Sequence, residues 1–410
     1  MVDNIMRKDV IIVGGGMVGL IQALALATHG LSSHIVDQAE PKTVLDPIFD
    51  GRVSSVASSS GKMLESIRLA ALLAEKGCDI EQIMVCDQLK PGTLDFKPTD
   101  VDGALATMYP NQVLLSALHE AASENDHISL HMPARIEAID RGEHIVTVLL
   151  ADGTKISAPL IIGADGRNSM VRKQAGIQTA QWSYEHVAMI CAITHEQPHQ
   201  NVAYEIFYPK GPFAILPMLD DEQGAHRSAI VWSVDEQDAP AYMALSDRGF
   251  AAEMSKCMGG FLGDIELSAP RQAYPIGYHQ TSKITADRIV LVGDAAHAIH
   301  PIAGQGLNLG IRDVAALTEC VVEGARLGLD LADPEILARY ERWRSLDNLM
   351  VAASSDGLKR LFGVKGQAAS AIRRFGLNMV QRAPKLKAAF MAEARGESGD
   401  LPKMLQGFQV

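Results

Sequence analysis

The architecture of this 410-residue chain follows from the segment VIIVGGGMVGL, residues 10–20. Its first four residues are β-branched and apolar, which is typical of a buried strand. Three glycines follow in the spacing Gly14-x-Gly16-x-x-Gly19, and the next residues are apolar at helical intervals. In such a unit Gly14 suits the tight turn, Gly16 lets the backbone approach a pyrophosphate, and Gly19 lets the helix pack closely on the strand.

A second strand is predicted over residues 33–37, and it ends at Asp37. A carboxylate at that place can accept a hydrogen bond from a ribose hydroxyl. The glycine spacing alone is a weak signal, but the strand before it, the helix after it and the acid beyond it together predict a dinucleotide site. This motif does not decide between NAD and FAD.

Composition narrows the class of protein. The net charge of −12 argues against nucleic acid as a partner. Apolar residues make up 47% of the sequence, yet no uninterrupted apolar run approaches the ~18 residues of a membrane span. The N-terminal residues lead into a strand pattern without the features of a signal peptide. Five cysteines without a CxxC pair indicate reduced thiols in a cytoplasmic protein.

Further elements follow from hydrophobic spacing. Helices are predicted over residues 61–75 and 111–124. A strand-turn-strand unit is expected over about 134–162, with its turn at Asp152-Gly153. Short alternating runs between residues 180 and 280 predict an antiparallel sheet.

The C-terminal part is predicted to be helical and basic. Residues 359–395 hold nine Lys or Arg and one acid, a net charge of +8. Three interpretations stay open: contact with an anionic bilayer, docking on an acidic protein surface, or a solvated helical face packed on the rest of the protein. Six apolar side chains favour peripheral contact: Ile372, Phe375, Leu377, Leu386, Phe390 and Met391.

A second stretch, IVLVGDAAHAIHPIAGQGLNLG at residues 289–310, is also suited to a cofactor. Asp294 directly follows a buried strand, where its carboxylate can accept hydrogen bonds from a polyol such as ribityl. Pro301 and Gly304 would let the backbone pass flat beside a ring. A helix then begins with outward-pointing N–H groups, which would stabilise the negative charge of a reduced flavin. These N–H groups belong to Gly306, Leu307 and Asn308.

Here a family resemblance becomes specific. The pattern GDAAHxxHPxxGQGxNxG resembles the second flavin motif of the aromatic-ring hydroxylases of the para-hydroxybenzoate hydroxylase type. The segment LIIGADGRNSMVR is similar to their DG motif, which implies that Asp165 lies near the flavin pyrophosphate and assists NAD(P)H use. Arg52 stands where the family has an arginine over the FAD phosphates. Gln112 stands where many relatives have arginine, which puts the FAD contact there in doubt, and Arg68 replaces a small residue near a helix end.

Within that superfamily the chain most resembles the ubiquinone-biosynthesis hydroxylases, in segments such as GPFAILPM, PIAGQGLNLGIRD and YERWRSLDN. The resemblance implies that NAD(P)H reduces FAD, that O₂ adds at C4a, and that the hydroperoxide hydroxylates a polyprenylated phenol. Pro301, Gly304 and Gln305 should frame the reacting flavin face. The sheet over residues 180–280, with Phe213, should cover the ring, and no general base can be named.

The implied fold class is α/β. A Rossmann-like FAD-binding domain would comprise residues 1–177 and 281–330, interrupted by an antiparallel-sheet substrate domain at 178–280. Part of 76–110 could join the substrate side, and 331–410 would form a C-terminal helical region. The protein would be cytoplasmic, with peripheral contact at the inner face of the membrane or with a ubiquinone biosynthetic complex through the basic C-terminal region.

Other interpretations of the function stay open. The protein could hydroxylate a small soluble aromatic acid, or be a catalytically silent flavoprotein subunit of the ubiquinone biosynthetic complex. A flavin halogenase is disfavoured because no WxWxIP segment occurs. His297 and His300 have a spacing that could bind a metal, but no third ligand is placed, so hydrogen bonding is favoured. Arg271 and Tyr274 either line the pocket or pack between domains.

Overall fold

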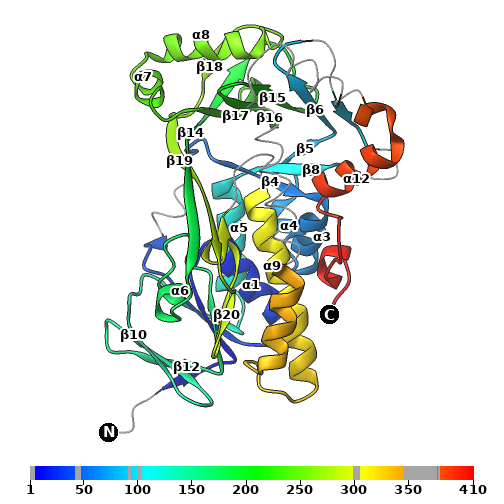
Figure 1. Ribbon diagram of the computed structural model, residues 1–410. Coiled ribbons are helices and arrows are strands. Elements are labelled where there is room, and N and C mark those ends of the chain that lie inside the picture. Colours follow the sequence, from blue (N-terminus) through cyan, green and yellow to red (C-terminus); the bar gives the residue numbers. More distant parts are fainter. Residues whose placement is uncertain are drawn as a thin grey trace.

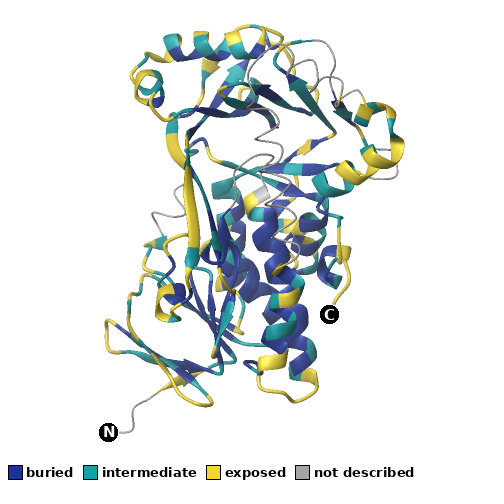
Figure 2. Ribbon diagram, viewed as in Figure 1, coloured by how far each residue is buried: buried dark blue, intermediate teal, exposed yellow. Residues whose placement is uncertain are grey.

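The computed structural model describes residues 5–41, 48–90, 94–98, 103–298, 305–345, 376 and 379–410. The described part has two layers of structure joined by long strands (Figure 1). A sheet with helices α1, α5 and α9 forms one layer, and a larger sheet capped by α7 and α8 forms the other. Buried residues concentrate on the strands and helices of each layer (Figure 2).

The first layer is built on a six-stranded sheet in the order β20-β21-β13-β2-β3-β9, in which only β20 is antiparallel. Strands β2 (Val10–Val13) and β3 (Ser33–Val36) lie in its centre, as the sequence predicts, and every residue of both is buried. The other strands are β9 (Ile128–His131), β13 (Leu160–Gly163), β20 (Thr285–Ala286) and β21 (Ile289–Leu291). The helices are α1 (Met17–Ala27), α5 (Asn111–Ser123), α6 (Met170–Gln174) and α9 (Gln305–Arg326).

A four-stranded sheet, β1-β12-β11-β10, lies beside it. The turn predicted at Asp152-Gly153 connects β11 to β12, where Gly153 has φ 87°. The single strand-turn-strand unit expected over 134–162 is in fact four strands, because a second turn at Gly142 precedes β11. These four strands are β10 (Ile136–Arg141), β11 (Val146–Leu150), β12 (Lys155–Ala158) and β13, of which the last belongs to the six-stranded sheet. The remaining strand of the four-stranded sheet is β1 (Met6–Arg7).

The second layer is a nine-stranded sheet in the order β22-β19-β14-β17-β16-β15-β6-β7, with β18 paired to β14. It is antiparallel throughout except between β15 and β6, so the antiparallel sheet predicted for 180–280 is confirmed. The strands are β6 (Gln82–Asp87), β7 (Leu94–Phe96), β14 (Thr179–His195), β15 (Val202–Tyr208), β16 (Gly211–Met218), β17 (His226–Asp235), β18 (Ile265–Leu267), β19 (Gln272–Thr281) and β22 (His297–Ala298).

Two helices that hydrophobic spacing did not reveal cover one face of this sheet: α7 (Ala239–Met243) and α8 (Asp247–Met258). Ser246 caps α8 by accepting a hydrogen bond from Gly249 N. Phe213 packs beneath these helices, with its ring 5.7 Å from that of Trp232. The expectation that Phe213 covers the flavin side is therefore wrong, because both faces of β16 are apolar and the sequence does not show which one points inward.

A small three-stranded sheet, β4-β8-β5, lies between the two layers (Figure 1). Its strands are β4 (Val53–Ala57), β5 (Cys78–Ile80) and β8 (Ala106–Pro110). The helix predicted over 61–75 is broken into α3 (Ser58–Ser66) and α4 (Ala70–Leu73). Arg68 lies at the break with φ 68°, so the departure at this position does coincide with a helix end.

The C-terminal part returns to the first layer. Residues 334–345 are helical, and α12 (Pro384–Ala394) and a 3₁₀ turn, η3 (Lys403–Gln406), follow. Met404 and Leu405 are completely buried in the main core beside α3 and α9. Leu386 and Phe390 are both exposed, although the Phe390 ring lies near that of Phe96, and Met391 packs against the apolar cluster that contains Phe96 and Met108. Ile372, Phe375 and Leu377 lie outside the described residues.

Candidate active site

The first glycine turn has no room for a side chain at two of its three glycines, Gly14 and Gly19. Gly14 has φ 112°, and a Cβ there would come within 2.3 Å of the carbonyl oxygen of Ala164. A Cβ at Gly19 would come within 1.9 Å of the Gly14 carbonyl oxygen. Both glycines therefore serve the close packing of β2, α1 and the segment after β13.

Gly16 differs from these two glycines, because no protein atom occupies the space next to its Cα. A Cβ there would meet no atom within 4 Å, and its backbone is extended with φ −77°. It occupies the N-cap of α1, where backbone N–H groups lack helical partners and favour an anion. Asp37 lies beside this turn and accepts hydrogen bonds from Gly15 N at 2.6 Å and Ala39 N at 2.7 Å.

The segment after β13 is held by Asp165. Its carboxylate accepts hydrogen bonds from Ser169 Oγ and from Met170 N at 2.6 Å, which caps α6. Arg172 of α6 is buried and donates to the carbonyl oxygen of Ala295 at 2.8 Å. Arg167 lies 3.2 Å from Asp294 on the surface. The DG and GD segments are thus fastened to one another.

A buried ionic network supports the GD segment from behind. Asp313 of α9 accepts hydrogen bonds from Gly293 N at 2.9 Å and from Arg344 Nε at 2.7 Å. His297 Nε2 lies 2.6 Å from the same carboxylate. Burial would raise the pKa of Asp313, but His297 and Arg344 outweigh it and lower the pKa, so the carboxylate is ionised. His297 is therefore a hydrogen-bonding residue in this structure, and His300 lies outside the described residues.

Val18 of α1 brings the two glycine motifs into contact. A Cβ at Gly293 would meet its side chain at 3.2 Å, and one at Gly310 at 2.9 Å. Small residues at both positions let α1 and α9 approach, and Gln22 Nε2 donates to Thr318 Oγ1 across the same helix pair. Two segments far apart in the sequence are thus in direct contact.

The first turn of α9 is anchored to the small sheet. Asn308 is buried, accepts from Ala57 N at 2.9 Å and donates to the Ser55 carbonyl oxygen at 2.8 Å. Its side chain therefore joins α9 to β4, a role that the sequence did not suggest. Gly306 and Leu307 precede it in the same turn, as predicted.

The remaining predicted site residues are distributed as follows. Arg52 lies at the start of β4, where its guanidinium pairs with Asp50 at 2.6 Å. Its carbonyl oxygen accepts from Asn111 N, next to Gln112, so these two positions are brought together. Gln305 begins α9, whereas Pro301 and Gly304 lie outside the described residues. Arg271 packs over the Phe250 ring at 5.0 Å, a contact within the layer of the larger sheet and not between the two layers, and Tyr274 is exposed.

His279 of β19 lies near the DG and GD segments, and sequence reasoning missed it. Burial lowers its pKa to about 4, helped by nearby Arg172, so the imidazole is neutral. It is 7% exposed, and its Nε2 has no hydrogen-bond partner among the described residues. An unpaired buried nitrogen between the DG and GD segments is a position that a bound group could satisfy.

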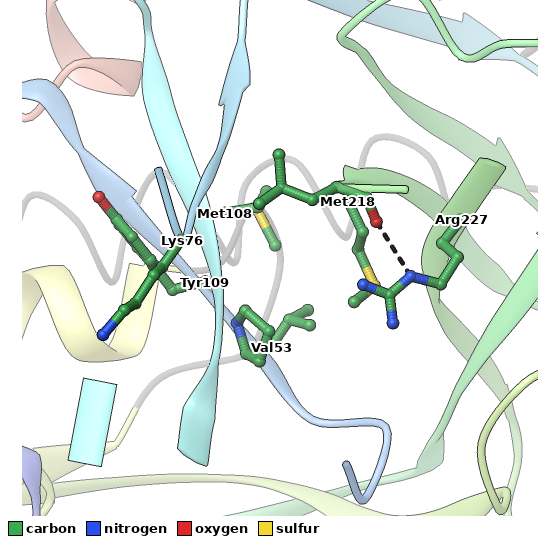
Figure 3. A pocket seen from close by; sticks show the side chains of 8 residues that line it. Val53, Lys76, Met108, Tyr109, Met218 and Arg227 are labelled. Carbon is green, nitrogen blue, oxygen red and sulfur yellow. Dashed lines mark hydrogen bonds between the residues drawn. The ribbon is translucent and has the colours of Figure 1, made fainter. Parts of the chain in front are cut away.

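Two hollows lie away from the glycine turns. One of about 40 Å³ lies between the small sheet and the ends of β16 and β17 (Figure 3). Met108, Tyr109 and Val53 line one side of it, and Met218 and Arg227 the other. A larger one, of about 360 Å³, is lined by residues of α3, α4 and β8. Neither includes a residue of the glycine motifs.

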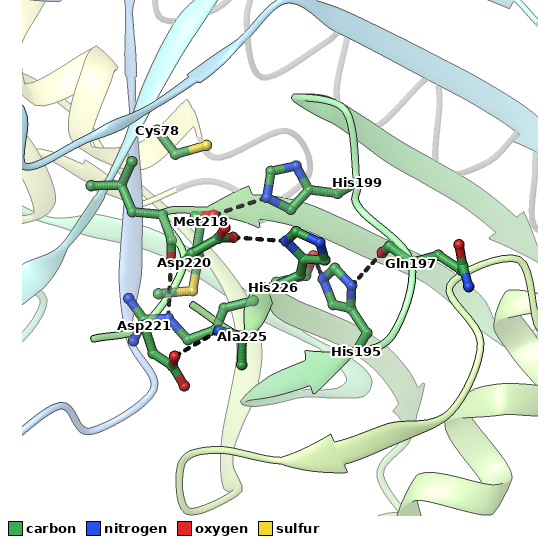
Figure 4. Close-up of polar contacts among 12 residues, drawn as sticks. Cys78, His195, Gln197, His199, Met218, Asp220, Asp221, Ala225 and His226 are labelled. Atoms are coloured by element: carbon green, nitrogen blue, oxygen red, sulfur yellow. Dashed lines mark hydrogen bonds and ion pairs between the residues drawn. The ribbon is translucent and has the colours of Figure 1, made fainter. Parts of the chain in front are cut away.

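A histidine cluster at the end of β14 has a structural explanation (Figure 4). His195 contacts Ser228 Oγ and the Gln197 carbonyl oxygen, and burial lowers its pKa. His199 contacts the Met218 carbonyl oxygen, and His226 pairs with Asp220. Within the described residues, no group of three or more His, Cys, Asp or Glu side chains could hold a metal ion.

Comparison with known proteins agrees with this assembly. The chain matches the family model described as "FAD binding domain" over residues 7–349, and it belongs to that family. It is a flavoprotein monooxygenase, a hydroxylase with the fold of the para-hydroxybenzoate hydroxylase superfamily.

The named relatives are similar over nearly the whole chain. Ubiquinone hydroxylase UbiL of Rhodospirillum rubrum is 38% identical, covering 97% of this chain and 92% of that protein. The 3-demethoxyubiquinol 3-hydroxylase of Escherichia coli is 32% identical, covering 95% and 98%. The crystal structure of p-nitrophenol 4-monooxygenase from Pseudomonas putida superposes with a TM-score of 0.78 at 16% identity, covering 97% and 100%, which shows the shared fold.

The residues present fit FAD. The open approach at Gly16 and the N-cap of α1 suit a pyrophosphate. The orphaned Nε2 of His279 offers a further hydrogen bond beside Asp294. The chain therefore supplies backbone donors, carboxylates and an unpaired imidazole around one site.

Proposed function

We propose that this protein hydroxylates the aromatic ring of a polyprenylated phenol in ubiquinone biosynthesis, with NAD(P)H as reductant and O₂ as oxygen donor. The observation that carries the proposal is the 38% identity to a ubiquinone hydroxylase across 97% of the chain. FAD would supply the redox chemistry that links NAD(P)H to O₂.

The chain's own residues would bind and orient this cofactor. Gly14, Gly16 and Gly19 would form the pyrophosphate turn, and Asp37 would lie at the ribose. Arg52, Gln112, Asp165 and Asp294 would surround the phosphates and ribityl chain. The loop with Pro301, Gly304 and Gln305 would frame the reacting face, followed by Gly306, Leu307 and Asn308 at the start of α9.

We also propose that different parts of the fold bind the cofactor and the substrate. Residues 1–177 and 281–330 would hold the cofactor, and 178–280 together with β6 and β7 would cover the substrate. The pairing of β6 with β15 supports adding this earlier segment to the substrate side. Exclusion of water between the two layers would limit wasteful release of H₂O₂.

Genetic loss tests the function directly. A strain lacking this protein should accumulate a quinone precursor one oxygen short, detected by mass spectrometry of extracted quinones. The wild-type gene should restore ubiquinone, Gly16→Ala should not, and the exposed control Glu236→Gln should restore it. An unchanged quinone profile in the deletion strain would remove the assignment.

Substrate delivery is proposed to use α12. Lys385 and Leu386 are exposed on this helix and Arg382 is exposed just before it, and Leu386 is 45% exposed, a mixture suited to an anionic bilayer surface. No helix among the described residues is long and apolar enough to cross a membrane. Because Met404 and Leu405 are core residues, truncation would unfold the chain, so charge reversal is the better test.

Arg382→Glu with Lys385→Glu should reduce binding to phosphatidylglycerol vesicles, measured by co-sedimentation, by about thirtyfold or more, because each lost positive charge is worth about 1 kcal/mol. The matched control, Lys256→Glu on α8, should bind as the wild type does. Unchanged sedimentation of the double variant would rule out this contact.

A further inference from the structure

Glu205 has an unusual position on the substrate sheet. It lies in the middle of β15, opposite Ala214 of β16 and Val85 of β6. Its neighbours Tyr204 and Ile206 pack with residues of α8, and the Tyr204 ring lies 4.7 Å from that of Phe261, just beyond the end of that helix. Because side chains alternate along a strand, Glu205 points to the opposite face, together with Ala203 and Phe207.

That face looks toward the flavin layer. Ala203 and Phe207 pack with Met108 of β8 and other residues of the small sheet. The small sheet is joined to the start of α9 through Asn308 at its β4 edge. The face that carries Glu205 is thus the one under which the substrate ring must lie if the proposed function is correct, and the inference below rests on that function.

The carboxyl group of Glu205 makes no polar interaction with the described residues. None of the described residues donates a hydrogen bond to it or forms an ion pair with it. Burial alone raises its pKa to about 7, although the side chain keeps some accessible surface. The flanking strands present Ala214 and Val85, and the titratable groups on this side are Asp87 at the end of β6 and the Cys78 thiol, whose pKa burial raises to about 11.

A carboxyl group left unpaired among apolar residues is costly, and such groups are concentrated at functional sites. We propose that Glu205 selects the substrate ring: its carboxylate accepts a hydrogen bond from the hydroxyl of a neutral phenol and repels a ring that carries its own carboxylate. This separates the polyprenylated phenol from the soluble aromatic acid, since an acid would require a cation at this place. The reaction that supplies the substrate must then already have removed any ring carboxylate.

Binding to the FAD-loaded full chain tests the assignment. The probes are 2-prenylphenol and 3-prenyl-4-hydroxybenzoate, followed by the change in flavin absorbance from pH 5.5 to 8.5. The wild type should prefer the neutral phenol by about tenfold or more at pH 8.5, and the preference should shrink as the pH falls and Glu205 takes up a proton.

Glu205→Gln should bind both rings within about threefold, without this pH dependence, because the repelling charge is gone. Glu205→Leu removes the charge without introducing an amide, and it should also bind both rings within about threefold at every pH. The control Glu236→Gln should keep the wild-type ratio of affinities. If both Glu205 variants keep the preference, the assignment of Glu205 is wrong while the proposed function stands. If the wild type binds neither ring, the proposed function fails and this inference fails with it.

Discussion

His297 Nε2 lies 2.6 Å from Asp313 Oδ2, and both side chains are buried. The carboxylate also accepts a hydrogen bond from the backbone of Gly293, so one ionised group fixes the loop that follows β21. His297 lies within the second glycine-rich stretch, in β22, whereas Asp313 lies just beyond it on α9. Their contact holds the described residues 293–298, which follow β21, against α9.

Asp313→Asn should strongly destabilise the protein. The amide would leave the Arg344 guanidinium buried without a counter-charge, and breaking a buried pair typically costs about 3–5 kcal/mol. The measurement is the urea midpoint together with the FAD content of the purified protein, both of which should fall. Glu335→Gln, an exposed carboxyl in the C-terminal helix, is the control. A normal midpoint for Asp313→Asn would show that the network is not needed for stability.

Arg68→Gly should stabilise the protein. Arg68 is exposed and has φ 68°, a conformation that glycine adopts without steric cost. The expected gain is about 0.5–1 kcal/mol in the free energy of unfolding, seen as a higher urea midpoint at constant slope. Glu65→Gly, inside α3, should instead lose about 1 kcal/mol. A loss at both positions would mean that the Arg68 side chain makes a stabilising contact.

Glu205→Gln should change stability in a pH-dependent way. Burial raises the pKa of Glu205 from 4.5 to about 7, so the folded state favours the neutral acid. The cost of ionisation is absent below about pH 4.5, grows as the pH rises, and is complete above about pH 7. The variant lacks this cost and should be more stable than the wild type by about 1–3 kcal/mol at pH 8, after allowance for partial solvent access.

Thermal unfolding of both proteins at pH 8 and at pH 5 measures this difference. It should be largest at pH 8 and nearly vanish at pH 5. A difference that is the same at both pH values would show that the carboxyl titrates normally, and a wild type that is the more stable at pH 8 would reverse the argument.

The parts of the fold that local chemistry determines were predictable from sequence. The strand at Val10–Val13, the glycine turn and the start of α9 agree with their spacing, because turn geometry and hydrophobic period act over a few residues. Asp313 was missed even though a charged residue beside the apolar positions Ile311 and Val314 signals a buried ion pair. Its partner Arg344 lies on another helix, and no local pattern links the two.

Other features depend on tertiary contacts. The side on which Phe213 packs follows from α7 and α8, which cover one of two equally apolar faces of β16. The isolation of Glu205 is visible only once β15 is placed between β16 and β6. The structural role of Asn308 also appears only when β4 lies beside α9, and its predicted contact with the flavin stays a prediction.

Titration of the FAD-free full chain with FAD, followed by quenching of flavin fluorescence, tests the central claim most directly. A Cβ at Gly16 has room in the protein, so Gly16→Ala should unfold at the wild-type temperature. It should nevertheless bind FAD at least about tenfold more weakly, because the methyl group occupies the approach to the pyrophosphate. Stoichiometric binding by the wild type and its loss in this stable variant is the predicted result. Equal FAD affinity of the two proteins, or a wild type that takes up no FAD, would contradict the account.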